Sequence, residues 1–242
     1  MKKFIMCITM LLTATAVTAQ NQVGTFSVKP MAGLNISNFG SSSFDIYKTR
    51  YGFIGGAEIE YGVSPWLGLS LGMVYSQQGA KMDGTVYLMD IDEAGYTLYS
   101  ESDFNGNLKC DYLNLPLMAN IYIPAVKGLA LKAGVQMGIL TSDKMEASVL
   151  TCISHFNHSN NIQVFDAMQQ AGIVEVLGTQ VSQTDVCKAI DFGIPVGLSY
   201  EFKNVSLDAR YYFGLTKVDK TENPDNSRNR FLSITLGYRF HL

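Results

Sequence analysis

Three side chains close together in the sequence have the chemistry to bind a metal: Cys152, His155 and His158. Cysteine thiolates and histidine imidazoles are common zinc ligands, and a structural zinc site uses four of them. The spacing Cys-x-x-His-x-x-His matches no established zinc motif, and no fourth ligand follows nearby. The polar residues at 157–161 favour ordinary loop histidines. We therefore expect neither a bound metal nor another cofactor.

Glu58 and Glu60 are the pair of carboxylates best spaced for acid–base chemistry. Residues two apart in a β-strand project from the same face. We expect Lys132 and Arg210 to share the same enclosed space, where ion pairing would engage both carboxylates. The sequence contains no phosphate-binding glycine loop. These features predict a protein that is not an enzyme.

The elements that would position these side chains are β-strands, because apolar residues recur at every second position in eight stretches. At the C-terminus, for example, Leu232 and Ile234 alternate with Ser233 and Thr235. Pro116 and Pro195 lie inside two of the stretches, where each removes a ladder hydrogen bond and predicts a bulge or bend. The expected strands cover residues 25–38, 51–62, 66–77, 110–123, 128–141, 189–202, 204–216 and 230–242.

The two faces of these strands differ in charge, since one register is largely apolar and the other holds most of the charges and glycines. A charge facing lipid near the membrane centre costs roughly 2–4 kcal/mol, so we expect the apolar register to face outward into lipid. Buried charges need partners, so the other register should form a salt-bridged lumen. Its expected members are Lys29, Glu58, Glu60, Lys132, Asp191, Glu201, Asp208, Arg210 and Arg239. The alternative is a soluble barrel or sandwich with the apolar register as its core.

The links between the strands alternate between long and short. Tight turns are expected at 62–65, 124–127 and 203–204. Long links are expected at 39–50, 78–109, 142–188 and 217–229. This pattern is typical of an all-β, antiparallel, up-and-down transmembrane β-barrel with short periplasmic turns and long extracellular loops. Side chains fill the interior of an eight-stranded barrel, which favours a closed lumen over the alternative of a narrow solute channel.

The N-terminus has the pattern of a secretory signal peptide. Lys2 and Lys3 precede an apolar run, and Val17 and Ala19 supply small residues before a cleavage site at Gln20. We expect residues 1–19 to be removed and 20–242 to form the barrel.

Composition excludes several other classes of protein. Charged residues make up 16% and hydrophobic residues 47% of the 242 residues, which excludes a disordered chain. A net charge of −3 provides no basic surface for nucleic acid.

Three cysteines follow the expected cleavage site, Cys110, Cys152 and Cys187, in an export pathway that permits disulfides. Cys152 and Cys187 both fall in or beside one long link, so they are our candidate disulfide pair. Three free thiols are the alternative.

The two longest links could also carry structure of their own. Residues 85–89 and 96–100 alternate as strands do, which predicts a hairpin projecting from the 78–109 link. The 142–188 link has helical spacing that would suit a lid over the barrel mouth or an exposed contact surface. The residues with that spacing are Val164, Met168, Ala171 and Val174.

Short motifs along the chain resemble the PorT-like outer-membrane β-barrel proteins of Gram-negative bacteria, a porin-like family. The resemblance covers nearly all of the chain beyond the signal peptide. It rests on residues 32–37, 52–56, 75–79, 112–117, 191–193, 210–215 and 236–240. It implies an eight-stranded barrel in the bacterial outer membrane with no shared catalytic residues.

The resemblance also implies partners. These are outer-membrane lipid, the barrel-assembly machinery that reads the C-terminal strand with its Phe240, and other envelope proteins that meet the extracellular loops. We expect a structural or surface-interaction role, and the alternatives are the narrow channel and an accessory role in a protein secretion system.

Overall fold

The computed structural model describes residues 23–40, 47–91, 97–154, 175–218, 220 and 227–242. The expected signal peptide, His155 and His158 lie outside these residues. Within them, no helix is long and apolar enough to cross a membrane.

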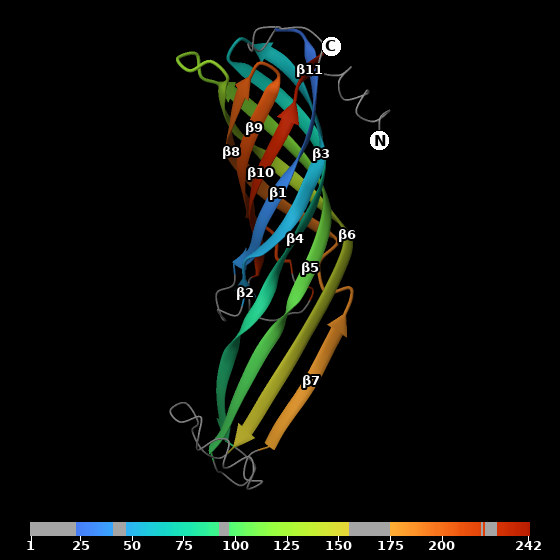
Figure 1. The fold of residues 1–242 in the computed structure, drawn as a ribbon, viewed down its shortest axis with the longest axis vertical. Helices are drawn as coiled ribbons and strands as arrows, with labels where there is room; N and C mark the ends of the chain where they lie inside the picture. The colour runs from blue at the N-terminus through green and yellow to red at the C-terminus, as the bar shows by residue number, and fades with distance from the viewer. Residues whose placement is uncertain (1–22, 41–46, 92–96, 155–174, 219, 221–226) are drawn as a thin grey trace, which may run out of the picture.

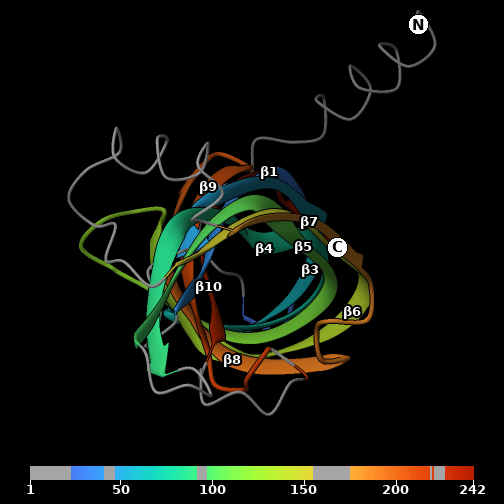
Figure 2. The ribbon, with the colours of Figure 1, turned by 90° about the horizontal axis from the view of Figure 1, so that it is seen from below.

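Eight antiparallel strands form a closed ring, as Figures 1 and 2 show. Each strand pairs with the next in the chain, and β10 pairs with β1 to close the barrel. The predicted eight-stranded up-and-down barrel is therefore confirmed. The ring strands are β1 (Phe26–Gly40), β3 (Arg50–Ser64), β4 (Leu67–Ile91), β5 (Thr97–Tyr122), β6 (Leu129–Ser154), β8 (Ile190–Phe202), β9 (Val205–Gly214) and β10 (Arg228–Tyr238).

Three shorter strands extend this ring. β2 (Tyr47–Lys48) pairs with β4, and β7 (Glu175–Gln183) pairs with β6. β11 (Phe240–His241) follows β10 after Arg239 and pairs with β1, so the end of the chain is held in the sheet.

The links confirm the predicted division between the two ends of the barrel. Short turns join β3 to β4, β5 to β6 and β8 to β9 at one end. Two of these turns use left-handed backbone, at Gly128 (φ 85°) and at Lys203 (φ 57°). The short-turn end is the periplasmic end of such a barrel, and the opposite end is extracellular.

The two registers point as the alternation predicts. Leu71, Met73 and Val135 on the outer face are each 59% exposed, whereas Lys132 and Asp208 on the inner face are 2% and 0% exposed. The outer face is therefore an apolar surface suited to lipid, and the charged register is enclosed. Large aromatic residues lie on the outer face near the strand ends, where membrane interfaces favour them; they include Phe26, Tyr51, Tyr61, Trp66, Tyr200, Phe202 and Phe213.

Strands β4, β5 and β6 are much longer than a membrane requires. They contain 25, 26 and 26 residues, whereas about 9–11 residues span a bilayer. Their distal parts leave the ring as a sheet to which β7 adds a fourth strand (Figure 1). We call this part, residues 80–91, 97–108, 143–154 and 175–183, the extracellular sheet.

The extracellular sheet confirms one expectation and corrects another. The predicted hairpin in the 78–109 link is the β4–β5 pairing, which continues to Ile91 and Thr97. The 142–188 link is not a simple loop, because β6 runs on to Ser154 and β7 pairs with it. The four residues with helical spacing, between 164 and 174, lie outside the described residues.

Pro116 and Pro195 each lie opposite a gap in the ladder, and no register shift marks a bulge at either position. Opposite Pro116, the β4–β5 pairing stops after Leu71 and resumes at Val74 in the same register. Opposite Pro195, the β6–β8 pairing stops after Ala133 and resumes at Gln136 in the same register. Proline has no backbone N–H to donate to the adjacent strand. The ladder therefore loses a hydrogen bond at each proline, while the register on either side stays the same.

Candidate functional site: the lumen and the extracellular mouth

Five charged side chains form a cluster in the middle of the lumen, which we call the central cluster. It consists of Lys29, Glu58, Lys132, Asp208 and Arg210, and all five are buried. Lys29 Nζ lies 3.2 Å from Glu58 Oε2 and 3.0 Å from Asp208 Oδ2. Lys132 Nζ lies 3.4 Å from Glu58 Oε2 and 2.8 Å from Asp208 Oδ1. Each carboxylate therefore serves both lysines.

Arg210 completes the central cluster. Its Nη1 donates to Glu58, and its Nη2 donates to Glu58 Oε2 at 2.9 Å and to Asp208 Oδ1 at 3.1 Å. Such forked contacts are the strong form of an arginine–carboxylate pair. The cluster contains three cations and two anions.

A second cluster lies nearer the periplasmic turns, around Arg239. Arg239 Nε lies 2.7 Å from Glu201 Oε2, and its Nη1 lies 3.0 Å from Glu60 Oε2. Asn120 and Tyr122 also donate to Glu60. This cluster therefore engages Glu60, one of the two glutamates considered for acid–base chemistry, fully in structural contacts.

Asp191 forms a third layer toward the extracellular side. It accepts hydrogen bonds from Tyr212 Oη at 3.0 Å, Asn229 Nδ2 at 2.9 Å and Thr216. All nine charged residues expected in the lumen are therefore buried and partnered there.

Inward glycines make room for the long charged side chains. A Cβ added at Gly197 would lie 3.0 Å from Arg210 Cγ, and one added at Gly237 would lie 3.1 Å from Lys29 Cγ. Larger residues at these positions would displace members of the central cluster.

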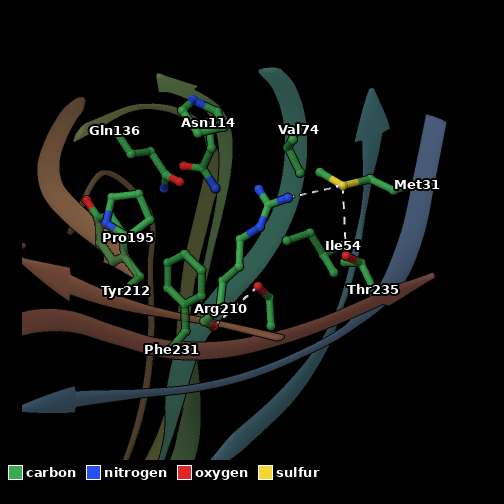
Figure 3. Close-up of a pocket in the computed structure, with 12 residues that line it drawn as sticks. Met31, Ile54, Val74, Asn114, Gln136, Pro195, Arg210, Tyr212, Phe231 and Thr235 are labelled. Atoms are coloured by element: carbon green, nitrogen blue, oxygen red, sulfur yellow. Dashed lines mark hydrogen bonds between the residues drawn. The ribbon is translucent and has the colours of Figure 1, made fainter. Parts of the chain in front are cut away.

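A small cavity lies beside Arg210 in the lumen (Figure 3). Its volume is about 20 Å³, enough for one water-sized occupant. Pro116 and Pro195 both line it. At this level the lumen is packed with side chains.

A buried apolar cluster, which we call the apolar cap, lies at the extracellular mouth of the lumen. The charged register becomes apolar here, and the buried members of the cap are Phe39, Ala80, Leu108, Cys110, Tyr112, Cys187 and Val218. Tyr47 and Met145 pack against them where the extracellular sheet begins. The sequence analysis did not identify this cap, although Leu108, Cys110 and Tyr112 continue one register of an expected strand.

The disulfide of the protein joins Cys110 to Cys187 within this cap. The expected Cys152–Cys187 bridge is therefore wrong. Cys152 pairs along the sheet with Glu101 and Val176, far along the extended β6, because β6 does not end where the link was expected to begin. Cys187 instead follows β7 back to the mouth, beside Cys110.

Asp143 holds the segment that carries Cys187. Its carboxylate accepts backbone N–H bonds from Asp185 at 3.0 Å, Val186 at 2.6 Å and Cys187 at 2.7 Å. Partial burial would raise the pKa of this carboxyl, but the three N–H donors and nearby Lys220 outweigh it and hold the pKa below its usual value. No sequence pattern pointed to this role.

Replacing Asp143 with asparagine should loosen this segment. We expect hydrogen–deuterium exchange of the 185–187 amides to accelerate roughly tenfold, a small effect because the carboxylate is partly exposed. The lowered pKa means that this stabilisation is complete above the ordinary value of 3.8 and disappears as the pH falls through the folded value. Asp103→Asn, at an exposed carboxylate on β5, is the control and should leave these amides unchanged. Equal exchange in both variants would contradict the role of Asp143.

The described residues contain no group of three or more histidine, cysteine, aspartate or glutamate side chains that could hold a metal ion. The sequence motif at 152–158 falls largely outside them.

Comparison with known proteins identifies related barrels. A family model described as the outer membrane protein beta-barrel domain matches residues 18–220. No curated protein matches the chain in sequence.

Among solved structures, the chain is similar to Ail, the attachment invasion locus protein of Yersinia pestis. The identity is 14%, covering 90% of this chain and 100% of that one, with a TM-score of 0.41. Neisserial surface protein A is 18% identical over 89% of this chain and 97% of that one, with a TM-score of 0.37. OprG of Pseudomonas aeruginosa is 10% identical over 93% and 100%, with a TM-score of 0.38.

Proposed function

The chain belongs to the outer membrane protein β-barrel domain family, and from this we propose that it is a non-enzymatic surface protein whose closed barrel anchors a binding sheet. It is a barrel of the bacterial outer membrane, with lipid around its apolar face. The observation that carries the proposal is the extracellular sheet, since β4, β5 and β6 continue well beyond the length that a membrane needs.

The extracellular sheet has free edges suited to binding an extended segment of another protein. Among the described residues, β7 pairs only with β6, and β4 has no outer partner beyond Met82. Exposed edges usually carry lysine or proline that discourages pairing. Residues 176–183 of β7 contain neither, nor any charge. A partner strand could therefore extend the sheet along β7.

Photo-crosslinking in intact cells tests this surface. A photoreactive residue at Thr179, exposed on β7, should yield crosslinks to another envelope or surface protein. The same residue at Lys127, in a periplasmic turn, is the matched control and should not give these products. Val181→Pro, which disrupts the β7 edge, should abolish them. Absence of crosslinks from Thr179 would contradict the proposal.

The charged lumen favours a closed barrel over the alternative of a narrow channel. All nine inward charges are buried and partnered, and the apolar cap lies at the mouth. We expect the purified protein to show no single-channel conductance in planar lipid bilayers. Discrete conductance steps that require the folded barrel would favour the channel.

The PorT-like resemblance supports a more specific variant, an accessory barrel in a protein secretion system. Its partners would be envelope proteins of that system, and the barrel-assembly machinery would meet the terminal strand that ends with β11. Identification of secretion components among the Thr179 crosslinks would distinguish this variant from a role in contact with other surface proteins.

A further inference from the structure

A cavity of about 170 Å³ lies within the apolar cap, at the extracellular mouth of the barrel. Phe39 of β1, Leu108 of β5 and Val218, which follows β9, are buried members of the cap and line this cavity. Tyr47 of β2 and Met145 of β6 line it where the extracellular sheet begins, and Figure 1 shows β2 at this level. The cavity shares no lining residue with the small cavity deeper in the lumen, so it is a separate site.

The walls of this cavity suit an apolar occupant better than water. Among the described residues that line it, none is charged, and the polar side chains are those of Gln183, Ser227 and, at its hydroxyl, Tyr47. A space of this size would hold several waters, each of which needs two to four polar partners. An apolar cavity of roughly 150 Å³ stays dry and binds benzene. Mostly apolar walls with a few polar groups are also typical of small-molecule sites.

The side chains that line the cavity favour an aromatic ring. Phe39 and Tyr47 lie edge to face, with ring centroids 5.7 Å apart and an interplanar angle of 83°. A third ring can join such a pair in the same favoured geometry. The Met145 thioether adds the sulfur–aromatic contacts that rings also favour. Ser227 is 7% exposed, and its hydroxyl can donate to or accept from one polar group on the ring.

The same walls disfavour a charged occupant. An ion placed here would lose its hydration, and the described lining residues offer no side chain of opposite charge to compensate for that loss. The volume also limits the occupant to about one ring, because sites for larger organic ligands usually measure roughly 300 Å³ or more.

We propose that this cavity is a binding site for one small, uncharged aromatic molecule of about the size of phenol. The ring packs against Phe39, Tyr47 and Met145, and its polar group meets Ser227. The occupant enters from the extracellular side and completes the packing of the apolar cap. The site is distinct from the proposed partner edge, since Gln183, the last residue of β7, is the one described residue of that strand that lines the cavity.

Fluorine NMR of para-fluorophenol with the purified barrel in detergent micelles tests the site. A single site saturates, whereas partitioning of the compound into micelles rises linearly with its concentration. We expect saturable binding of one molecule per barrel, and no saturable binding of para-fluorobenzoate, which has the same ring but carries a charge at neutral pH. A linear response equal to that of empty micelles would overturn the proposal. Saturable binding of para-fluorobenzoate would overturn the uncharged class of ligand.

Two matched variants locate the binding. Val218→Phe fills part of the cavity and should weaken binding of para-fluorophenol by about tenfold or more. Val135→Phe makes the same change on the outer face, where the side chain is 59% exposed, and should leave the affinity unchanged. Equal affinity in the two variants would overturn the assignment to this cavity. The comparison of the two compounds uses the unaltered protein, so it decides the proposal even if Val218→Phe fails to fold.

Discussion

The Asp208→Asn variant is expected to lose about 3–5 kcal/mol of unfolding free energy, the usual cost of removing one partner from a buried ion pair. Asp208 is fully buried and accepts from Lys29, Lys132 and Arg210. Asparagine preserves the shape of the side chain but removes the charge, so three cations would face Glu58 alone. The measurement is urea unfolding in lipid vesicles, followed by fluorescence of Trp66, the single tryptophan, which is exposed in the turn between β3 and β4.

Two further variants separate this effect from a general sensitivity to substitution. Asp185→Asn removes an exposed carboxylate that pairs with Lys220 and should leave the unfolding curve unchanged. Adding Lys132→Met to Asp208→Asn restores the original net charge of the cluster and should recover part of the lost stability. If Asp208→Asn unfolds like the unaltered protein, the central cluster does not stabilise the barrel. The ion pairs would then no longer favour a closed lumen over a channel.

The contrast between lumen and mouth shows what the sequence can predict. The period-2 alternation identified all eight ring strands, because a lipid-facing register tolerates almost no charge and so stands out along the chain. The same reasoning placed residues such as Glu58 and Arg210 on one inner face. The alternation could not show which cation pairs with which carboxylate, because the pairing depends on the stagger between strands that are far apart in the sequence.

The mouth was harder to predict because its contacts join segments without periodic patterns. The first part of the expected link after residue 142 is a continuation of β6. The composition of the chain did not show where the lipid-facing part of this strand ends and its continuation into water begins. Asp143 acts through three backbone N–H groups, which no residue pattern encodes. The disulfide was misassigned for the same reason, since proximity in sequence favoured Cys152 and the sheet carried that residue away.

Removing the Cys110–Cys187 disulfide is the second change expected to have a large effect. The bond closes a segment with a sequence separation of 77 residues, and on the chain-entropy model this constraint contributes about 4 kcal/mol by restricting the unfolded chain. Both sulfurs are buried in the apolar cap, so a reductant added to the folded barrel should react slowly. The double variant Cys110→Ser, Cys187→Ser therefore gives a cleaner measurement than reduction.

Serine at these positions also places hydroxyl groups in the apolar cap, so Cys110→Ala with Cys187→Ala provides a second form of the test. Both double variants should unfold at lower urea concentrations, and Cys152→Ser should behave like the unaltered protein. Peptide mapping without reductant should recover the fragment containing residue 110 linked to that containing residue 187. Recovery of a 152–187 link would contradict the Cys110–Cys187 pairing. Equal unfolding of all variants would show that Asp143 and apolar packing hold the cap without the disulfide. We expect stability to depend on Cys110 and Cys187 and not on Cys152, because β7 returns the chain to the barrel mouth and places Cys187 beside Cys110.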